Sequence, residues 1–342
     1  MRDYLEKLMQ ANDLTMDEIG HVTNLCLTED IPNTQIAAFL TALRIKGETP
    51  EEIAGIAQVI REQSVMSDIQ LANVMDNCGT GGDRSNSFNI STTSAFVLAG
   101  AGIPVAKHGN RSVSSTTGSA DVLEQLGVSL TMTKEQIETT LKENNIVFLF
   151  APHVHAKLKP FMQVRQQLGL PTIFNLIGPL TNPVELDAQL MGVYDRTKLT
   201  TIAKALRTLG RKRALVLNGA GNMDEGSLAG ENHLVLLEDG KIQSFTVHPN
   251  DVGLPVYDNE AIRGGDAKQN AEILRSVLNN EPSAYLDTVL FNAALGLFAN
   301  GKARTIIEGI DIAKESIQSG KALHALNYLI NVSNNETHSI IS

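Results

Sequence analysis

The chain has 342 residues, of which 42% are hydrophobic, and a formal net charge of −10. This composition predicts a soluble globular protein with one large domain or two, and the acidic charge argues against a nucleic-acid partner. No apolar run reaches membrane-spanning length, the N-terminus lacks a signal-peptide core, and Cys26 and Cys78 form no metal or disulfide pattern, so we expect a cytoplasmic protein without a membrane partner.

Residues 1–67 predict a small helical domain. Thr15 and Glu18 form a capping box ahead of one helix, and a second helix begins near Asn33. The run Thr-Pro-Glu-Glu at 49–52 starts a third helix, with an N-cap threonine followed by proline at the first helical position. The apolar faces of these helices can pack on one another or on a second subunit.

A glycine-rich turn, Cys-Gly-Thr-Gly-Gly-Asp, follows at 78–83 and precedes a helix expected at 92–101. Its glycines expose successive main-chain N–H groups, and the next helix begins with hydroxyl side chains, which is a favourable place for phosphate. The turn predicts a phosphate-binding strand–loop–helix, although an ordinary tight connection is the alternative. It fits neither the dinucleotide fingerprint nor the Walker A loop, whose glycine and lysine spacings differ.

A second loop is dense in hydrogen-bond donors. A short buried strand is expected at 103–106, and it ends at Lys107. The loop that follows runs from His108 to a helix expected at 119–126. Ligands of open parallel sheets bind beyond the carboxyl ends of the strands, so we expect both loops to face one pocket. A solvated linker is the alternative for this loop.

Strand and helix patterns alternate from residue 74 onward, which predicts a mostly parallel sheet flanked by helices, with an antiparallel hairpin that turns at Asp239-Gly240. The expected strands are 146–150, 188–193, 214–218 and the hairpin 234–247; the expected helices are 134–144, 199–209, 267–279, 284–299, 305–318 and 320–332.

Residues 150–183 combine several polar groups with an irregular backbone. Arg165 lies on an expected helix, and its planar donor fork suits a carboxylate, with a surface ion pair as the alternative. Gly178-Pro179 and the Asn-Pro pair at 182–183 interrupt any regular helix. His153 and His155 form only a weak metal pattern, because no cysteine or acid stands at ligand spacing.

Asp224 and Glu225 follow the strand expected at 214–218. A bare Asp-Glu pair is usually a solvated turn. At the carboxyl end of a strand, in line with the two donor-rich loops, both carboxylates can instead reach one Mg²⁺, which prefers one or two carboxylates together with phosphate oxygens and water.

Six blocks in register resemble the anthranilate phosphoribosyltransferase family: 78–83, Asn-Ile-Ser-Thr at 89–92, Lys-His-Gly-Asn-Arg at 107–111, Gly-Ser-Ala-Asp at 118–121, Thr-Ile-Phe-Asn-Leu-Ile-Gly-Pro-Leu-Thr-Asn-Pro at 172–183, and Asp224-Glu225. The resemblance implies transfer of phosphoribose from phosphoribosyl pyrophosphate (PRPP) to the amine of anthranilate in tryptophan biosynthesis, with Mg²⁺ as cofactor. It also implies a homodimer.

The implied fold is α/β and similar to the nucleoside phosphorylases: a small helical domain and a large domain with a mostly parallel mixed sheet flanked by helices. In this arrangement the helical domain takes residues 1–67 and is joined by roughly 165–185, while 74–164 and 186–342 form the phosphoribosyl-binding domain.

The resemblance also implies roles for individual residues. Anthranilate is expected at Gly79, Asn110 and Arg165, with His108, Pro152, His155 and Gly178 along its path, and the metal at Ser91, Asp224 and Glu225. PRPP is expected at Gly79, Gly82, Asp83, Ser87, Asn89, Ile90, Ser91, Thr92, Lys107, His108, Gly109, Asn110, Arg111, Ser112, Val113, Ser114, Ser115 and Ser119. No residue is nominated as an acid or base.

Two other functions stay open. A pyrimidine nucleoside phosphorylase would share the architecture and release a pyrimidine from a nucleoside, and a non-catalytic phosphate or nucleotide sensor would bind the donor without turnover.

Overall fold

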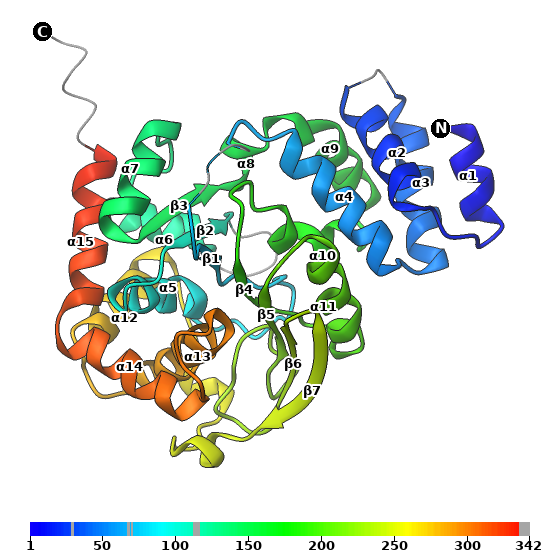
Figure 1. The fold of residues 1–342 in the computed structure, drawn as a ribbon. Helices are drawn as coiled ribbons and strands as arrows, with labels where there is room; N and C mark the ends of the chain where they lie inside the picture. Colours follow the sequence, from blue (N-terminus) through cyan, green and yellow to red (C-terminus); the bar gives the residue numbers. More distant parts are fainter. Residues whose placement is uncertain (29–30, 67–68, 70, 112–116, 335–342) are drawn as a thin grey trace, which may run out of the picture.

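The computed structural model describes residues 1–28, 31–66, 69, 71–111 and 117–334. Figure 1 shows an N-terminal group of helices at one end of the molecule and a larger α/β part at the other. The strands of the α/β part lie between helices, which confirms the predicted class of fold.

Four helices form the N-terminal group: α1 (Arg2–Met9), α2 (Met16–Thr28), α3 (Asn33–Lys46) and α4 (Pro50–Glu62). The predicted caps are present. The amide of Glu18 donates to the Thr15 hydroxyl at 3.2 Å, and Thr49 and Glu52 form a reciprocal capping box before α4. Glu52 also accepts from the amide of Leu14 at 3.0 Å, so the buried carboxylate that caps α4 holds the start of α2 as well.

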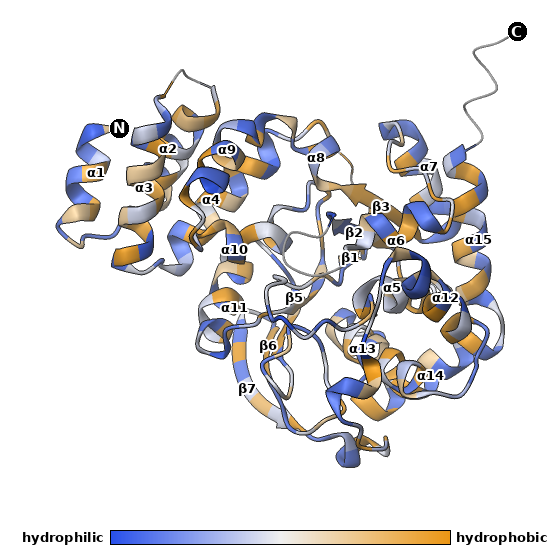
Figure 2. Cartoon of the chain, turned by 180° about the vertical axis from the view of Figure 1, so that it is seen from behind, coloured by the Kyte–Doolittle hydropathy of each residue, from blue (hydrophilic) through white to orange (hydrophobic). Residues whose placement is uncertain are grey.

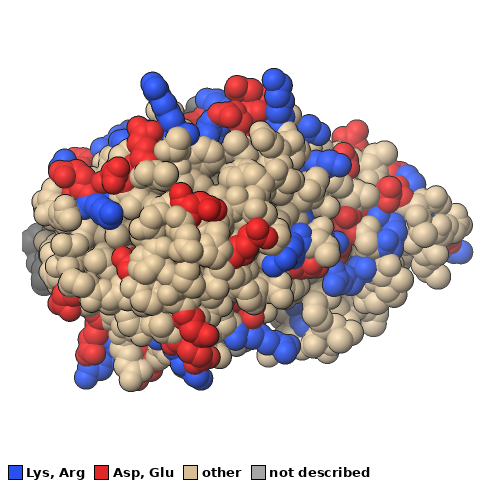
Figure 3. All heavy atoms as spheres, turned by 90° about the horizontal axis from the view of Figure 1, so that it is seen from below, with Lys and Arg blue, Asp and Glu red and all other residues tan. Residues whose placement is uncertain are grey.

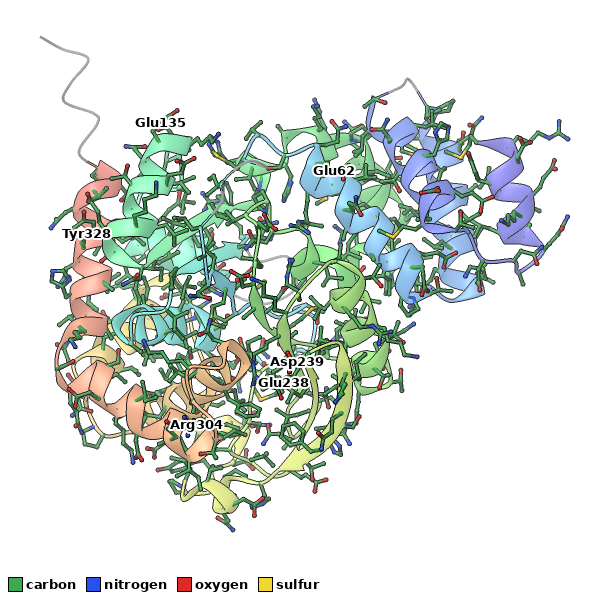
Figure 4. The ribbon with its side chains drawn as sticks, in the orientation of Figure 1. Glu62, Glu135, Glu238, Asp239, Arg304 and Tyr328 are labelled. Atoms are coloured by element: carbon green, nitrogen blue, oxygen red, sulfur yellow. The ribbon has the colours of Figure 1, made fainter. Side chains whose placement is uncertain are left out.

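Within the described residues one sheet has the order β3-β2-β1-β4-β5-β6-β7. Strands β3, β2, β1, β4 and β5 run parallel, and the hairpin β6–β7 is antiparallel, as predicted. Asp239 and Gly240 both adopt positive φ at its tip, the geometry of a tight hairpin turn (Figure 4). The strands are β1 (Met75–Asp76), β2 (Val105–Gly109), β3 (Ile146–Phe150), β4 (Ala188–Gly192), β5 (Arg213–Asn218), β6 (Asn232–Glu238) and β7 (Lys241–Val247).

The remaining α-helices connect and cover these strands. They are α5 (Ile90–Gly100), α6 (Ser119–Gln125), α7 (Lys134–Asn144), α8 (Ala151–Val154), α9 (Lys159–Leu168), α10 (Phe174–Ile177), α11 (Leu199–Thr208), α12 (Ala267–Leu278), α13 (Ala284–Asn300), α14 (Ile306–Gln318) and α15 (Lys321–Asn334).

Two hydrophobic cores share the sheet because successive strand residues point to opposite faces. Leu215 and Leu217 face the larger core, which includes α5 and α13. Ala214 and Val216 face the second core, which joins α11 to the N-terminal helices and to α9. Helix α13 is apolar on nearly all sides, and Figure 2 shows it mostly in orange between the sheet and α14. The second core makes the N-terminal helices continuous with the face of the sheet.

Several predicted boundaries differ from the structure by a few residues, and those of β2 and α5 bear on the site. Strand β2 begins at Val105 and continues to Gly109, because each of its residues pairs with β3; His108 and Gly109 therefore lie in the strand and not in the loop after it. Helix α5 begins at Ile90, two residues earlier than expected. Between 172 and 183 the chain forms only α10 and the 3-10 turn Gly178–Thr181, as the prolines and glycine predict.

In the described part of the chain, no helix is long and apolar enough to cross a membrane. On the face drawn in Figure 3 acidic and basic residues are interspersed, and neither sign forms one continuous patch.

Candidate active site

The turns that follow β1 and β5 meet at the carboxyl edge of the sheet. The amide of Gly81 donates to Asp224 Oδ2 at 2.6 Å, and the amide of Ser91 donates to Glu225 Oε1 at 3.2 Å. Gly82, with φ +84°, places its Cα beside the ring of Tyr194 in the turn after β4. The parallel strands bring their carboxyl ends to one edge, where the turns after β1, β4 and β5 contact one another.

Two of the residues in contact with Asp224 are glycines, because a side chain at either position would collide with Asp224. A Cβ on Gly79 would lie 2.3 Å from Asp224 Oδ2, and a Cβ on Gly192 would lie 1.5 Å from Asp224 O. Neither approach is possible for any other residue without moving the backbone. Gly79 is one of the predicted binding residues, whereas Gly192, which ends β4, is not.

Helix α13 holds the other side of the same turn. Asn292 is 1% exposed, and its side-chain amide pairs with the main chain of Gly226 through two hydrogen bonds of 2.8 Å, one in each direction. These two hydrogen bonds fix the main chain of the residue that follows Glu225. Asn292 lies among apolar residues in the middle of α13, and it is not one of the predicted site residues.

The carboxylates at this edge carry more negative charge than the protein neutralises. Burial first, and then the charges of Asp83 and Glu225, hold the pKa of Asp224 well above its ordinary range. Burial raises the pKa of Glu225 to about 7, although Lys107 and Ser91 oppose the shift. Three acids beside one lysine favour a bound cation.

The donor set fits Mg²⁺ held partly by a ligand. Asp224 and Glu225 supply carboxylate oxygens, and Ser91 adds a hydroxyl next to Glu225. Among the described residues, no three His, Cys, Asp or Glu side chains are grouped to hold a metal by themselves. Mg²⁺ normally takes one or two carboxylates and completes its shell with phosphate oxygens and water, which is what this arrangement leaves open.

Lys107 brings the positive charge to this edge from inside β2. Its side chain is buried, and Nζ lies 3.5 Å from both the carbonyl and the side-chain oxygen of Asn77. Asp76, at the end of β1, lies close enough for its charge to interact with that of Lys107. Burial raises the pKa of Asp76, and the lysine charge and the amide of Asn182 oppose the shift.

Asn182 connects the α/β part to the N-terminal helices. Its Nδ2 donates to Asp76 Oδ2 at 2.9 Å and to the carbonyl of Ala106 at 2.7 Å, and its own carbonyl accepts from Arg61 Nε at 3.1 Å. One buried residue thus joins the end of β1, β2 and α4, through its side chain and its main-chain carbonyl. Asn182 lies in a recognised block, and Asp76 lies two residues before another, but neither is among the predicted site residues.

The start of α5 offers an anion site. Ser91 and Thr92 occupy its first turn after Ile90, where main-chain N–H groups lack helical partners. Asp83 and Ser87 lie in the preceding loop, where Ser87 Oγ is 3.2 Å from Ser85 Oγ. These predicted residues surround the N-terminus of the helix.

The second predicted loop is placed only in part. His108 and Gly109 belong to β2, and Asn110 O accepts from the Ser119 hydroxyl at 3.2 Å at the start of α6. Arg111 pairs with Asp121 and Glu124 on α6. The remaining predicted residues of this loop, Ser112, Val113, Ser114 and Ser115, lie outside the described residues.

Arg165 on α9 keeps its guanidinium available. The group lies 5.2 Å from the centroid of the Phe174 ring, and Nη1 contacts Met162 Sδ at 3.4 Å. Within the described residues it pairs with no carboxylate, and burial lowers its pKa. A half-buried cation without an acidic partner suits an incoming carboxylate.

His108 and His155 form a buried pair, with ring centroids 5.2 Å apart and the rings nearly perpendicular. Burial lowers the pKa of His108 to about 3 and that of His155 to about 4. Both rings are therefore neutral near pH 7. His153 is exposed while His155 is buried, so the two do not form the metal site that their spacing weakly indicated.

Comparison with known proteins places these features in a family. The helical bundle domain of the glycosyl transferase family matches residues 2–64, and the a/b domain of that family matches residues 71–323. The chain is 57% identical to anthranilate phosphoribosyltransferase of Oceanobacillus iheyensis over 333 residues, covering 97% of this chain and 98% of the relative. It is 54% identical to the Bacillus cereus enzyme of the same name over 340 residues, covering 99% of this chain and 100% of the relative.

Solved structures agree. Anthranilate phosphoribosyltransferase from Thermus thermophilus superposes with a TM-score of 0.92 at 37% identity, covering 97% of this chain and 99% of that chain. The enzyme from Saccharomyces cerevisiae in complex with PRPP and Mg superposes with a TM-score of 0.88 at 28% identity, covering 97% of each chain.

Proposed function

This chain belongs to the anthranilate phosphoribosyltransferase family, and we propose that it transfers the phosphoribosyl group of PRPP to the amine of anthranilate, releasing pyrophosphate, in tryptophan biosynthesis. The observation that carries this function is the contact between turns 143 residues apart, where the Gly81 amide meets the Asp224 carboxylate beside the N-terminus of α5. This edge can hold a diphosphate and its counter-ion together.

The donor site takes the residues expected from the sequence. PRPP binds along the turn from Gly79 to Asp83, at the N-terminus of α5 with Ser87, Asn89 and Ser91, and at Lys107. The N-terminus of α5, the buried lysine and the PRPP complex of the yeast relative support this placement.

Mg²⁺ binds at Ser91, Asp224 and Glu225, a site that the excess of buried acid supports. When bound, the ion neutralises the charge of the pyrophosphate and makes it a better leaving group. The PRPP complex of the yeast relative also contains Mg.

Anthranilate binds with its carboxylate on Arg165 and its ring near Gly79 and Asn110. The absence of an acidic partner for Arg165 among the described residues supports this assignment. The yeast relative has also been solved with 4-fluoroanthranilate. His108, Pro152, His155 and Gly178 line the path of the acceptor.

Catalysis by this chain is mostly positioning and electrostatic stabilisation. Lys107 and the amides of α5 hold the departing pyrophosphate while the ribose becomes oxocarbenium-like and the amine attacks from the opposite face. Well-oriented reactants can lower a barrier by roughly 7–11 kcal/mol. The amine is already neutral at pH 7 and loses its proton to water or pyrophosphate after the attack; the low pKa of the buried histidines supports a mechanism without a protein acid or base.

The domain arrangement and assembly follow the family. The helical domain takes 1–67 with roughly 165–185, which is supported by the packing of α9 against α2 and α3 in one core. A homodimer forms through this domain, and the exposed Met9 and Ile45 on α1 and α3 support it. The protein acts in the cytoplasm, consistent with its two free cysteines.

Loss of anthranilate fluorescence on adding protein, PRPP and Mg²⁺ tests the function directly. No loss with these substrates, together with release of a pyrimidine from thymidine or uridine in phosphate, would establish a nucleoside phosphorylase instead. Tight binding of PRPP without turnover of anthranilate would establish a sensor.

A further inference from the structure

Four residues close a ring of hydrogen bonds beside the start of α5. Asn270 Nδ2 donates to Asn89 Oδ1 at 2.9 Å, and Asn89 Nδ2 donates to the carbonyl of Thr117 at 3.3 Å. The Thr117 hydroxyl donates to the carbonyl of Gly265 at 2.8 Å, and the amide of Gly265 donates back to Asn270 Oδ1 at 2.8 Å. The ring joins three parts of the chain that are far apart in sequence, at Asn89, at Thr117 and at residues 265–270.

The ring belongs to a larger set of contacts, here called the clasp, in which residues 262–270 pack along the loop 86–89 that leads into α5. Residues 262–265 run alongside 86–88: the amide of Phe88 donates to the carbonyl of Ile262, and the amide of Gly264 donates to the carbonyl of Asn86. Asn270 sits in the first turn of α12, is 2% exposed, and follows directly from this strip. The clasp gives the loop a rigid backing outside the sheet.

We propose that Asn270 is a positioning residue for PRPP binding, acting through Asn89 and Thr117. This inference rests on the proposed function, because Asn89 is a donor-site residue there. Asn270 fixes which end of the Asn89 amide is the oxygen, since Oδ1 must accept from it. The Nδ2 group then has one hydrogen on Thr117 and a second hydrogen in a fixed direction.

Only an asparagine serves this position. Its side chain must accept from Gly265 and donate to Asn89 within one short amide. Aspartate would accept from Gly265 but face Asn89 Oδ1 with a second acceptor, and alanine would leave the Gly265 amide without its partner. Thr117 lies directly before the N-cap of α6, so the same ring ties the N-terminus of α5 to that of α6.

The test compares PRPP binding by calorimetry, in Mg²⁺, with KM values for both substrates. Asn270→Ala should raise the Kd and KM for PRPP about ten-fold, while the KM for anthranilate at saturating PRPP changes less than about two-fold. Thr117→Val, which removes only the ring hydroxyl, should raise the Kd several-fold, and Thr117→Ser should restore it. Both substitutions disrupt the same ring. The double variant Asn270→Ala with Thr117→Val should therefore raise the Kd for PRPP by a smaller factor than the product of the two single-variant factors.

Matched controls lie elsewhere in the fold. Asn144→Ala removes a buried asparagine whose Nδ2 donates to the carbonyl of Ala325 at 2.9 Å, and Thr140→Val removes a buried hydroxyl on the same helix. Both should leave PRPP affinity within about two-fold of the parent protein, whatever they do to thermal stability.

The outcomes separate the two proposals. If the parent protein binds no PRPP, the proposed function fails. If it binds PRPP and a folded Asn270→Ala variant binds equally well, or loses affinity for anthranilate as much as for PRPP, the positioning role of Asn270 is wrong. If Asn270→Ala does not fold, the comparison of Thr117→Val with Thr117→Ser decides, and equal Kd values would overturn the ring's role.

Discussion

Asp224 and Gly81 are joined by a 2.6 Å hydrogen bond from the glycine amide to the carboxylate. The bond connects the turn after β5 to the turn after β1, and β4 lies between these strands in the sheet. The acid that we propose as a metal ligand therefore also fixes the backbone of the turn that we propose binds the diphosphate. Changes to either turn should therefore alter metal and donor binding together.

Asp224→Asn should raise the Mg²⁺ concentration needed for half-maximal rate about ten-fold or more. The amide keeps the size of the side chain and one acceptor for Gly81, but it removes the charge that attracts the ion. The measurement is a Mg²⁺ titration at fixed PRPP. Asp311→Asn, on the exposed side of α14, is the control and should titrate like the parent protein. An unchanged titration for Asp224→Asn would remove Asp224 from the metal site.

Local signals made much of the fold predictable. Thr49 and Thr133 predict the starts of their helices. In each case the N-cap hydroxyl and the acid or amide three residues later accept hydrogen bonds from each other's main-chain N–H groups within one turn. Asp239-Gly240 predicts the hairpin, because a two-residue hairpin turn needs positive φ and few residue types adopt it readily. In each case the partners are neighbours in sequence, so no knowledge of the tertiary fold was needed.

The features that were not predicted depend on contacts between residues that are far apart in the sequence. The true extent of β2 depends on pairing with β3, which no residue of β2 reveals on its own. Asn182 and Asn292 donate to main-chain carbonyls, and Asn270 donates to the side chain of Asn89, in each case at least 66 residues away in the sequence. The glycine at 192 is required only because Asp224 passes beside it. Short motifs along the chain could be recognised in the sequence, whereas the residues that contact them from distant parts of the chain could not.

Arg165→Ala should raise the KM for anthranilate about 10- to 100-fold, the expected cost of one hydrogen-bonded charge, and change the KM for PRPP less than about three-fold. The measurement is steady-state kinetics with each substrate varied in turn. Arg275→Ala, an exposed arginine on α12, is the matched control and should leave both constants unchanged. A larger rise for PRPP than for anthranilate would show that Arg165 serves the donor.

Gly192→Ala should abolish most of the activity and weaken Mg²⁺-dependent PRPP binding. The new Cβ would lie 1.5 Å from the carbonyl oxygen of Asp224, so the metal-binding turn must move. Gly20→Ala is the control: its Cβ would meet only Val59, at 3.6 Å, inside α2. That change should keep full activity and raise stability by up to about 1 kcal/mol, because alanine favours the helix. Normal PRPP binding by Gly192→Ala would mean that the turn tolerates displacement.

His155 should make the protein sensitive to acid. Burial lowers its pKa from 6.5 to about 4, so the folded protein resists a proton that the unfolded chain accepts. This contribution to stability is fully present above about pH 6.5 and is lost as the pH falls toward 4, up to about 3 kcal/mol in all. His155→Asn removes the titrating group, so its free energy of unfolding, measured by denaturant titration at several pH values, should fall less steeply than that of the parent protein between pH 6.5 and 4. His324→Asn, which changes an exposed histidine on α15, should leave the slope as it is. Parallel curves for the parent protein and His155→Asn would show that His155 takes up its proton equally in both states.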